Sequence, residues 1–571
     1  MLILLPMHVH HSLGPIDHCS VMSSESQRKI SWMMLGIPFL LAGPVQSVFP
    51  APKFEDYSSS NASFVLTFEP TSNIQSFMPT TPLDILTEAM KRFIARTVLA
   101  VPDFEQDYEV NPLHLRLQPL DTFRFNPFDH STSLDQDTDE SYLLEIDSEV
   151  TITTATVFGA IRALETLAQL LQFGWLDDHG RPIFLIHKTP LAIKDSPTFV
   201  YRGLLIDTSR HYLPIPLLLA NLDAMAMNKL NVLHWHMTDD QSWPFQSTHY
   251  PELSEQGAFH PKRIYSHSDI LHVIQEAKLR GIRVIPEFDM PGHTDAVAIS
   301  HPELMSHCPF AGDPMDPTNE DTWTFISNLY HEIGDLFQDH YVHLGGDEVP
   351  LDCWGNDTSI EAWMKLNHVD DVVDLFKIFE KRLLAVIEKL GKKAIVWQEV
   401  FDLGVPIAND TIVDVWKDWD GQEGSTIHQA TSAGYPVILS ACWYLDHLNE
   451  RWQDYYQCDP IGFNLTLAQQ ELIIGGHASM WGEHVDPSNF MSRVWPRASA
   501  AAEKLWTGTD TKASATVSDR IHAFRCHMLR QGIQAGPTGP GYCDKEPGFQ
   551  LHGASIEWNE IDLQLSMQRY V

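Results

Sequence analysis

Basic residues are scarce in this chain: 38 lysines and arginines stand against 75 aspartates and glutamates, and the formal net charge is −37. A field of that sign repels nucleic acid and anionic membranes, so we expect neither as a partner. The charge suits solubility in an acidic or extracellular compartment. No internal repeat of the solenoid type is evident either.

A membrane-spanning run is also missing. The apolar stretch at residues 30–42 is shorter than the roughly 20 residues that a bilayer requires. It follows Arg28 and Lys29 and precedes the small residues Gly43 and Ser47, which is the order of a secretory signal. We therefore predict a removable signal within residues 1–47, with Met22 as the true start.

The seven cysteines show no Cys-x-x-Cys or other zinc-binding spacing. Cys19 falls in the predicted signal, and the even number that remains agrees with disulfides in a secreted protein. Which of them pair cannot be read from their positions alone. In a secretory pathway, four sequons would permit N-glycosylation, at Asn61, Asn356, Asn409 and Asn464.

What the chain does contain is a regular alternation of short apolar strands and amphipathic helices. This alternation predicts a parallel sheet, and eight strands predict an α/β fold of the (β/α)8 TIM-type barrel class. The predicted strands are residues 203–207, 232–236, 283–287, 341–344, 394–397, 411–416, 436–440 and 472–474. The clearest helical periodicity lies at residues 215–228, 266–280, 321–337 and 372–390.

The connections after the sixth and seventh strands are the weakest, with short helical candidates only at residues 425–433 and 467–471. Ahead of the barrel, a hairpin at residues 141–154 and a helix at 157–173 predict a smaller α+β domain. The acidic stretch at 135–140 reads as a solvated loop. The predicted domains are a signal (1–47), the α+β domain (48–197) and a catalytic barrel with C-terminal helices (198–571).

The fourth predicted strand ends in two adjacent carboxylates, Asp347 and Glu348. Barrel enzymes carry their active sites at the C-terminal ends of the strands, so this pair is the leading catalytic candidate. Retaining glycosidases usually hold two carboxylates about 5–5.5 Å apart, flanking the sugar ring. Neighbouring Cα atoms are about 3.8 Å apart and successive side chains diverge, so this pair does not suit that arrangement.

A substrate with a 2-acetamido group removes the need for a protein nucleophile, because its own carbonyl oxygen attacks the anomeric carbon. On this hypothesis Glu348 is the acid, while Asp347 holds the acetamido N–H and stabilises the positive charge that develops there. The charge of Asp347 would also raise the pKa of Glu348 and help to keep it protonated.

Seven stretches of the barrel, in order, closely resemble the motifs of the β-N-acetylhexosaminidases of glycoside hydrolase family 20. They are YRGLLIDTSRHYLP (201–214), NKLNVLHWH (228–236) with Asp239 and Asp240, EFDMPGHT (287–294), HLGGDEV (343–349), VWQEV (396–400), WYLD (443–446) and MWGE (480–483). The similarity extends into the preceding domain through GAIRALET (159–166).

The resemblance implies a role for each matching residue. Glu348 matches the general acid/base, and Asp347 matches the carboxylate that orients the acetamido group. The other matches are Arg210, Asp446 and Glu483 for the outer sugar hydroxyls, Tyr444 for the acetamido oxygen, Trp397, Trp416 and Trp481 for the walls of the sugar pocket, and Asp239 with His293 for a relay toward the acid. It also implies disulfides Cys308–Cys353 and Cys526–Cys543, which leaves Cys442 with Cys458.

Two departures from the family pattern concern specificity. The stretch from residue 294 to 343 is short beside the animal lysosomal members, so the loop bordering the leaving-group side is a candidate for trimming. Asp446 and His447 stand where some relatives have Asn followed by Arg. An anionic Asp446 should repel sulfated sugars, and we expect poor activity on 6-sulfated N-acetylglucosaminides.

Plainer interpretations remain open at this stage. Trp416 in an apolar run is more often a core residue, and Arg210 is an ordinary salt-bridge candidate. His234 and His236 alternate on one strand and could fill the barrel; as metal ligands with Asp239 they would need a further converging ligand. Asp207 and Asp289 could cap loops or form buried ion pairs.

The sequence therefore predicts an exo-acting, retaining β-N-acetylhexosaminidase that acts on oligosaccharide ends, such as chitooligosaccharides or N-glycans. No cofactor or metal is expected. The predicted location is the secretory pathway, either secreted or in a lysosome-like or vacuole-like compartment, and a homodimer is possible. Two alternatives are a glycosidase with Glu399 or Glu483 as nucleophile, and a carbohydrate-binding or adhesion protein on an inactive barrel.

Overall fold

The computed structural model describes residues 48–57, 63–67, 85–99, 117–119, 123–125, 131–176, 182–308, 314–417, 422–508 and 511–543. The predicted signal, Cys19 and the sequon at Asn61 lie outside these ranges. Across the described helices, none combines the length and the apolar character needed to cross a membrane.

Two mixed sheets make up the N-terminal part of the chain. The five-stranded sheet has the order β1-β9-β5-β6-β4, and the four-stranded sheet has the order β3-β2-β8-β7. Their strands are β1 (Phe54–Tyr57), β2 (Ser63–Thr67), β3 (Leu117–Pro119), β4 (Phe123–Phe125), β5 (Tyr142–Ile146), β6 (Val150–Thr154), β7 (Gln172–Leu176), β8 (Pro182–His187) and β9 (Leu191–Asp195).

Helices α1 (Ile85–Leu99) and α2 (Val157–Leu170) supply the apolar core of this α+β part, together with side chains from β5, β6, β8 and β9. The predicted hairpin is present as β5 and β6. Thr156 caps α2 by accepting a hydrogen bond from the backbone N–H of Gly159. The helix ends at Leu170, three residues before its predicted end at Phe173, because that segment pairs with β8 as strand β7.

Eight parallel strands form a closed barrel in chain order, which confirms the predicted fold class. They are β10 (Tyr201–Asp207), β11 (Val232–Thr238), β12 (Arg283–Phe288), β13 (Tyr341–His343), β14 (Lys393–Trp397), β15 (Ile412–Val415), β16 (Val437–Leu439) and β17 (Ile473–Met480).

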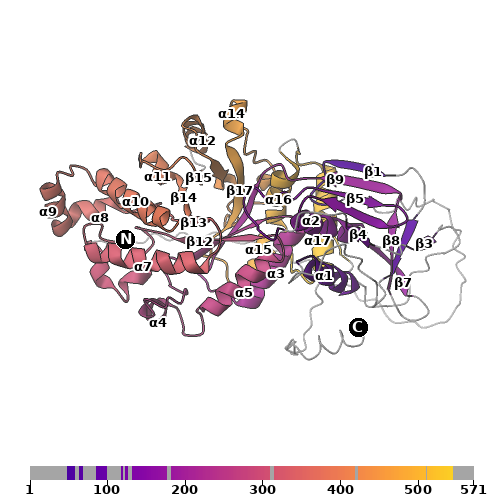
Figure 1. The fold of residues 1–571 in the computed structure, drawn as a ribbon, viewed down its shortest axis with the longest axis horizontal. Coiled ribbons are helices and arrows are strands. Elements are labelled where there is room, and N and C mark those ends of the chain that lie inside the picture. Colours follow the sequence, from indigo (N-terminus) through magenta and orange to yellow (C-terminus); the bar gives the residue numbers. More distant parts are fainter. Residues whose placement is uncertain are drawn as a thin grey trace, which may run out of the picture. The chain divides into compact units, whose positions relative to one another are not determined.

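Helices connect and flank these strands (Figure 1). The longer connecting helices are α3 (Ile215–Met227), α5 (His267–Lys278), α7 (Glu320–Leu336), α10 (Val372–Lys389) and α12 (Gln422–Ser432), and α16 (Arg497–Thr507) and α17 (Ala515–Arg530) follow the last strand. The shorter ones are α4 (Glu252–Gly257), α6 (Asp295–Ala298), η2 (Pro302–Leu304), α8 (Leu351–Asn356), α9 (Thr358–Asn367), α11 (Gln398–Asp402), η4 (Ala441–Trp443), α13 (Trp452–Tyr455), α14 (Leu467–Gln470) and α15 (Phe490–Val494).

Of the two weak connections, the one after β15 contains the regular helix α12, whereas the one after β16 contains only the short elements η4, α13 and α14. The connection between β14 and β15 is short as well, with only the five residues of α11 in helical form. Short connections here leave the strand ends β14 to β17 close to the loops that follow them.

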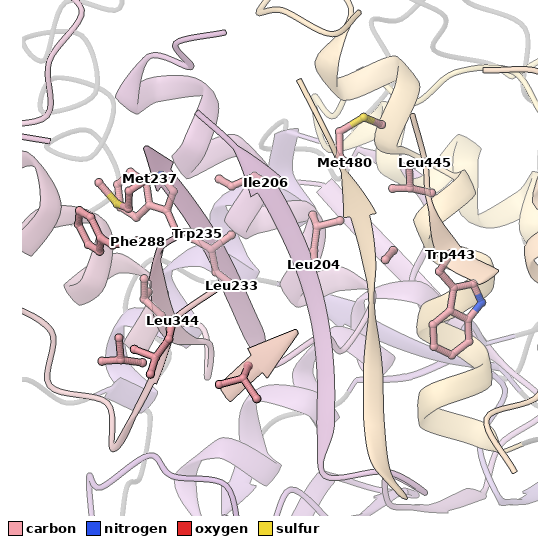
Figure 2. Close-up of a cluster of buried hydrophobic side chains, with 14 of the residues drawn as sticks. Leu204, Ile206, Leu233, Trp235, Met237, Phe288, Leu344, Trp443, Leu445 and Met480 are labelled. Carbon is pink, nitrogen blue, oxygen red and sulfur yellow. The ribbon is translucent and has the colours of Figure 1, made fainter. Parts of the chain in front are cut away.

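Toward their N-terminal ends the barrel strands are apolar on both faces, which explains their continuous hydrophobic runs. Alternate residues such as Leu204 and Ile206 on β10, and Leu233 and Trp235 on β11, belong to the large buried cluster between barrel and helices (Figure 2). The other set points inward. Its lower layer is a separate apolar cluster made of Tyr201, Val232, Ile285, Tyr341, Ile395, Ile412 and Ile438.

Two residues further along most of these strands, the inward positions become polar. This second layer, nearer the C-terminal ends, contains His234, Glu287, His343, Trp397, Asp414 and His477, all 0–1% exposed. The change from an apolar layer to a polar layer marks which end of the barrel can carry chemistry.

Two further structural expectations were wrong. The eighth strand continues six residues past Ile474, through Gly475 and Gly476, which resemble a turn in the sequence. Gly475 has φ +142°, and a Cβ there would lie 1.8 Å from the carbonyl oxygen of Tyr201 on β10, so only glycine lets the strands pair. The acidic stretch is not wholly solvated, because Glu140 is buried between the guanidinium groups of Arg162 and Arg202.

Three disulfides join Cys308 to Cys353, Cys442 to Cys458 and Cys526 to Cys543. The first and the third are the pairs that the family resemblance implies, and the second is the pair that was left by elimination. Cys353 lies on α8, directly after the acid pair, and Cys442 lies on η4 just before Tyr444. Two of the three therefore brace segments next to the barrel mouth.

Candidate active site

The loop after β13 presents Asp347 and Glu348 at the C-terminal mouth of the barrel. Gly345 allows this path: its φ is +73°, and a Cβ there would lie 1.7 Å from Oδ1 of Asp289. Glu348 itself has φ +51°, in the left-handed region that glutamate rarely adopts. The backbone is therefore strained at Glu348. Such strain is common at catalytic sites.

Glu348 is the more accessible of the two acids, with 59% of its side chain exposed against 11% for Asp347. Burial of the carboxyl and then the charge of Asp347 raise the pKa of Glu348, which favours the protonated form. Nε2 of His293 lies 3.6 Å from Oε2 of Glu348. The direction of the pKa shift is the one a proton donor requires.

Asp289, which sequence reasoning left unassigned, lies directly behind Asp347. Its Oδ1 accepts a 2.8 Å hydrogen bond from the backbone N–H of Gly346. Complete burial, the charge of Asp347 and a hydrogen bond with that residue raise the pKa of Asp289 well above its usual range. The raised pKa favours the protonated form of Asp289, and in that form it can donate to the Asp347 carboxylate.

A second series of polar contacts runs from the acid pair to the barrel interior. Nδ1 of His293 lies 3.2 Å from Oδ1 of Asp239, whose other oxygen accepts a 2.8 Å hydrogen bond from Nε2 of His236. Although burial opposes it, the hydrogen bond to Asp239 and the charge of Asp347 raise the pKa of His293 to about 9. His293 is therefore a cation beside both acids.

Arg210, in the loop after β10, is held by three partners. Its Nη2 lies 2.8 Å from Oδ2 of Asp239, its Nη1 lies 3.3 Å from Oδ2 of Asp207, and its Nε donates to Gln241 over 2.9 Å. The guanidinium also lies over the ring of Trp481, 5.1 Å from its centroid. A planar donor group fixed in this way suits the recognition of sugar hydroxyls.

Four aromatic rings from successive strand ends form a continuous wall. The centroid of Trp481 lies 6.2 Å from that of Trp397 and 6.4 Å from that of Tyr444, and the centroid of Tyr444 lies 6.3 Å from that of Trp416. Rigid rings of this kind exclude water and pack against the apolar faces of sugars. The predicted wall residues are therefore together at the mouth.

Asp446 and Glu483 complete the predicted set. Burial raises the pKa of Asp446 to about 6, and the neighbouring charge of Glu483 adds to the effect. Glu483 is exposed and lies close enough to interact electrostatically with Arg210. Within the described part of the chain, Oδ1 of Asp446 has no hydrogen-bond partner, so it is available to accept from a ligand.

Glu287 is a functional candidate that the sequence did not reveal. Its Oε2 accepts from His234 and His236, both over 2.7 Å, and its Oε1 accepts from Nε1 of Trp397 over 2.8 Å. Burial alone would raise the pKa of the Glu287 carboxyl. The nearby histidines, of which His343 has the largest effect, hold this pKa well below its usual range. The alternating polar residues His234, His236, Glu287 and Asp289 were the available signal.

His234 and His236 fill the barrel interior, as the plainer interpretation had it. Both ring nitrogens of His236 are engaged, by Glu287 and Asp239. His234, His343 and Asp414 bring ligand-type atoms within 4.8 Å of one another. The rings of His234 and His343 stack at 4.5 Å with an interplanar angle of 27°.

Glu399, the alternative nucleophile, is engaged through both of its oxygens. Oε2 accepts a 2.8 Å hydrogen bond from Nε1 of Trp416, and Oε1 lies 2.9 Å from Nζ of Lys417. Burial and the charge of Asp347 raise the pKa of Glu399 to about 7 against the effect of Lys417. These contacts favour a supporting role for Glu399 over attack on a sugar.

Comparison with known proteins agrees with this geometry. Residues 199–509 match the family model described as glycosyl hydrolase family 20, catalytic domain, and residues 48–170 match a model described as beta-acetyl hexosaminidase like. The chain therefore belongs to glycosyl hydrolase family 20. Its enzymatic class is that of the β-N-acetylhexosaminidases.

Individual relatives support the same assignment. The chain is 43% identical over 418 residues to the human beta-hexosaminidase subunit beta. The aligned residues cover 72% of this chain and 74% of that subunit. The chain is 40% identical over 480 residues to the rat beta-hexosaminidase subunit alpha, covering 81% and 88%. Among solved structures, a chitobiase of Flavobacterium johnsoniae superposes with a TM-score of 0.71 at 29% identity, covering 85% of this chain and 73% of the other.

Proposed function

We propose that this enzyme removes terminal, non-reducing β-linked N-acetylglucosamine and N-acetylgalactosamine with retention, using the 2-acetamido group of the substrate as nucleophile. The observation that carries the proposal is the adjacency of Asp347 and Glu348 at one strand end, because two neighbouring side chains there do not face each other across a sugar ring. Glu399, the nearest alternative, already binds Trp416 and Lys417.

In the first step the acetamido carbonyl oxygen forms a bond to the anomeric carbon while the bond from that carbon to the leaving oxygen breaks. Glu348 gives its proton to the leaving oxygen, a transfer that the raised pKa of its carboxyl favours. Asp347, oriented by Asp289, accepts a hydrogen bond from the acetamido N–H and stabilises the positive charge of the cyclic intermediate.

In the second step Glu348, now a carboxylate, takes a proton from water as the water oxygen attacks the anomeric carbon. The acetamido group is released and the β configuration is restored. The cationic His293 lies 3.6 Å from Glu348 and supports its charged form between the two steps. Asp239 in turn holds His293 in place.

Binding of the sugar falls to the remaining residues. Arg210 donates to the outer hydroxyls, and Asp446 and Glu483 accept from them. Trp397, Trp416, Trp481 and Tyr444 enclose the acetamido group, with the phenol of Tyr444 donating to the carbonyl oxygen that attacks. This distribution supports an exo mode of action, because outer hydroxyls that are bound by the protein leave no place for a further sugar.

The natural substrates we propose are neutral oligosaccharide ends, such as chitooligosaccharides or N-glycans. The three disulfides support a location in the secretory pathway, where cysteines are oxidised, in a secreted or lysosome-like setting. The relatives are described as subunits, which supports a dimeric assembly for this chain as well. Sequons at Asn356, Asn409 and Asn464 fall on exposed residues and are proposed glycosylation sites.

The test is hydrolysis of paired aryl glycosides that differ only at the 2-substituent. The acetamido sugar should be cleaved with a β-configured first product, and replacement of acetamido by hydroxyl should abolish turnover. A thiazoline that mimics the cyclic intermediate should inhibit strongly, as transition-state-like ligands do. Equal turnover of the 2-hydroxy sugar, or a trapped glycosyl ester on the protein, would refute the mechanism.

A further inference from the structure

Two side chains of the polar barrel layer, Asp414 and His477, have no part in the proposed reaction steps. Asp414 lies on β15 and His477 on β17, and both are fully buried. Nε2 of His477 lies 2.6 Å from Oδ2 of Asp414. Burial would raise the pKa of Asp414, but the neighbouring His477 lowers it to about 2, so this carboxylate can only accept a hydrogen bond. His477 therefore carries a proton on Nε2.

Each member of this buried pair contacts a serine hydroxyl. Oγ of Ser440 donates to Oδ1 of Asp414 over 2.9 Å, a closer contact than the 3.3 Å to the carbonyl oxygen of Val415. Oγ of Ser479 lies 3.2 Å from Nδ1 of His477. Both serines are fully buried as well. A buried carboxylate is tolerated only when it is paired and hydrogen-bonded, so these contacts tie the two serines to the pair.

The two serines hold the two ends of the short segment that carries Tyr444. Ser440 directly precedes η4, and its carbonyl oxygen accepts from the backbone N–H of Trp443 over 2.8 Å. At the other end, the backbone N–H of Leu445 donates to the carbonyl oxygen of Ser479 over 2.7 Å. Trp443 and Leu445 are themselves buried in the large apolar cluster (Figure 2). The backbone is therefore anchored immediately before and immediately after Tyr444.

The phenol of Tyr444 lies near the charges of Asp414 and Asp347. Burial, then the charge of Asp414 and then that of Asp347 raise the pKa of Tyr444 well above its usual range. The phenol therefore keeps its proton and can donate it in a hydrogen bond. In the proposed function it donates to the acetamido carbonyl oxygen, the atom that attacks the anomeric carbon. A misplacement of about 1 Å at such a group can lower the rate about 10²-fold.

We propose that the buried pair of Asp414 and His477 positions the phenol of Tyr444 against the acetamido carbonyl oxygen. The proposal rests on the proposed function and adds two positioning residues that lie below the mouth and do not contact the sugar. Asp414 acts through Ser440 at the start of the segment, and His477 acts through Ser479 at its end. Loss of the pair lets Tyr444 shift, so the effect falls on the reaction of the acetamido group.

The test is a double-mutant cycle between Asp414→Asn and Tyr444→Phe, measured as kcat/KM on an aryl N-acetylglucosaminide. Tyr444→Phe removes the phenol, and Asp414→Asn removes the charge but keeps the size of the side chain. Each single variant should lose about tenfold, the scale of one hydrogen bond. Because Asp414 acts through Tyr444, Asp414→Asn should cause no further loss when the phenol is already absent. A purely structural role would give losses that add.

His477 offers a matched pair of variants that tests the proposal even if Asp414→Asn does not fold. Glutamine places its amide near the position of Nε2 and can still donate to Asp414, so His477→Gln should keep most of the wild-type kcat. Asparagine is one carbon shorter and does not reach Asp414. His477→Asn should therefore lose about tenfold in kcat, like Asp414→Asn.

Asp195→Asn is the control, because it is the same substitution in a buried ion pair near the opposite end of the barrel. An oxygen of Asp195 lies 2.9 Å from Nζ of Lys229, which precedes the start of β11, and both side chains are buried. This variant should lower the free energy of unfolding in urea titrations but leave kcat unchanged. The loss caused by Tyr444→Phe should be the same with and without it.

The outcomes separate the proposal from the proposed function. Non-additive losses in the cycle, with kcat kept in His477→Gln and reduced in His477→Asn, support the proposal. Additive losses, or a wild-type kcat in His477→Asn, would overturn it and leave the proposed function standing. An unchanged kcat/KM in Tyr444→Phe would overturn it together with the role given to the phenol. Turnover of a 2-hydroxy glycoside by the wild type would overturn the proposed function itself, and the proposal with it.

Discussion

Nε1 of Trp416 donates a 2.8 Å hydrogen bond to Glu399, and Nε1 of Trp397 donates one of the same length to Glu287. Two indoles of the aromatic wall are thus each held by a glutamate that is no more than 9% exposed. A carboxylate acceptor fixes the plane of each ring, since an indole has a single N–H.

The first prediction concerns Glu399 as a positioning residue. Glu399→Gln keeps an acceptor for Trp416 but loses the charge that pairs with Lys417, so kcat/KM should fall about tenfold, the scale of one hydrogen bond. The loss should lie mainly in KM, because the ring contacts bound sugar. If Glu399 were the nucleophile, kcat would fall by several orders of magnitude and azide would restore turnover. Steady-state kinetics with and without azide decide between the two.

Removal of the proton donor should depend on the leaving group. Glu348→Gln should lower kcat about 10²- to 10⁴-fold for a methyl glycoside, which needs protonation of its leaving oxygen. A dinitrophenyl glycoside leaves without a proton, so its first step should be little affected. Pre-steady-state measurement of released dinitrophenol checks this. Equal losses on both substrates would argue against Glu348 as the acid.

The pH profile should report the influence of Asp347 on Glu348. Activity needs a protonated Glu348 and falls as the pH rises through the pKa of this carboxyl, which burial and then Asp347 raise. Asp347→Asn removes the second cause, so the alkaline limb of kcat/KM should move to lower pH, in addition to the loss of acetamido orientation. An unchanged alkaline limb, measured with an aryl glycoside, would show that another group controls it.

His293 should stabilise the fold in a pH-dependent way. Its pKa is raised to about 9 from an ordinary value near 6.5, so its contribution is full below pH 6.5 and is lost as the pH rises through 9. His293→Asn tolerates the φ of +55° and can still donate to Asp239, but it cannot carry charge. The difference in free energy of unfolding between wild type and variant should therefore shrink between pH 6.5 and 9.5. A constant difference in urea titrations would contradict this.

Discrimination against 6-sulfated N-acetylglucosaminides should increase with pH. Burial raises the pKa of Asp446 to about 6, so this residue is mostly neutral at pH 5 and mostly anionic at pH 7. The ratio of kcat/KM for neutral over sulfated substrate should rise about tenfold over that interval, in step with the ionised fraction. In Asp446→Asn the ratio should be lower and independent of pH. Comparable efficiency on both substrates at pH 7 would refute the assignment.

Local pattern was enough to predict most of the barrel. All eight strands and the helices α3, α5, α7 and α10 were anticipated, because the strands give short apolar runs between amphipathic helices. The error at the end of the eighth strand came from Gly475 and Gly476. Glycine is required at these two positions because the neighbouring strands lie too close for a Cβ atom. A single sequence does not distinguish this requirement from that of a turn.

Polar groups that are satisfied only by distant residues were harder to foresee. Glu140 was taken for a solvated acid because its sequence neighbours are acidic, yet it is buried with Arg162 and Arg202, far along the chain. Asp289 and Glu287 were left without a role for the same reason: their partners, Asp347 and Trp397, come from other strands. The acid pair itself was visible because adjacency in sequence fixes its geometry.

The left-handed backbone conformation of Glu348 implies that catalytic activity and thermal stability oppose each other at this position. A glutamate at φ +51° destabilises the native state by an amount on the order of 1–2 kcal/mol relative to glycine, which adopts this region freely. Glu348→Gly should accordingly give an inert protein that melts at a higher temperature than the active one. Selection for thermal stability alone would then favour replacement of Glu348. Only selection for catalytic turnover would retain it.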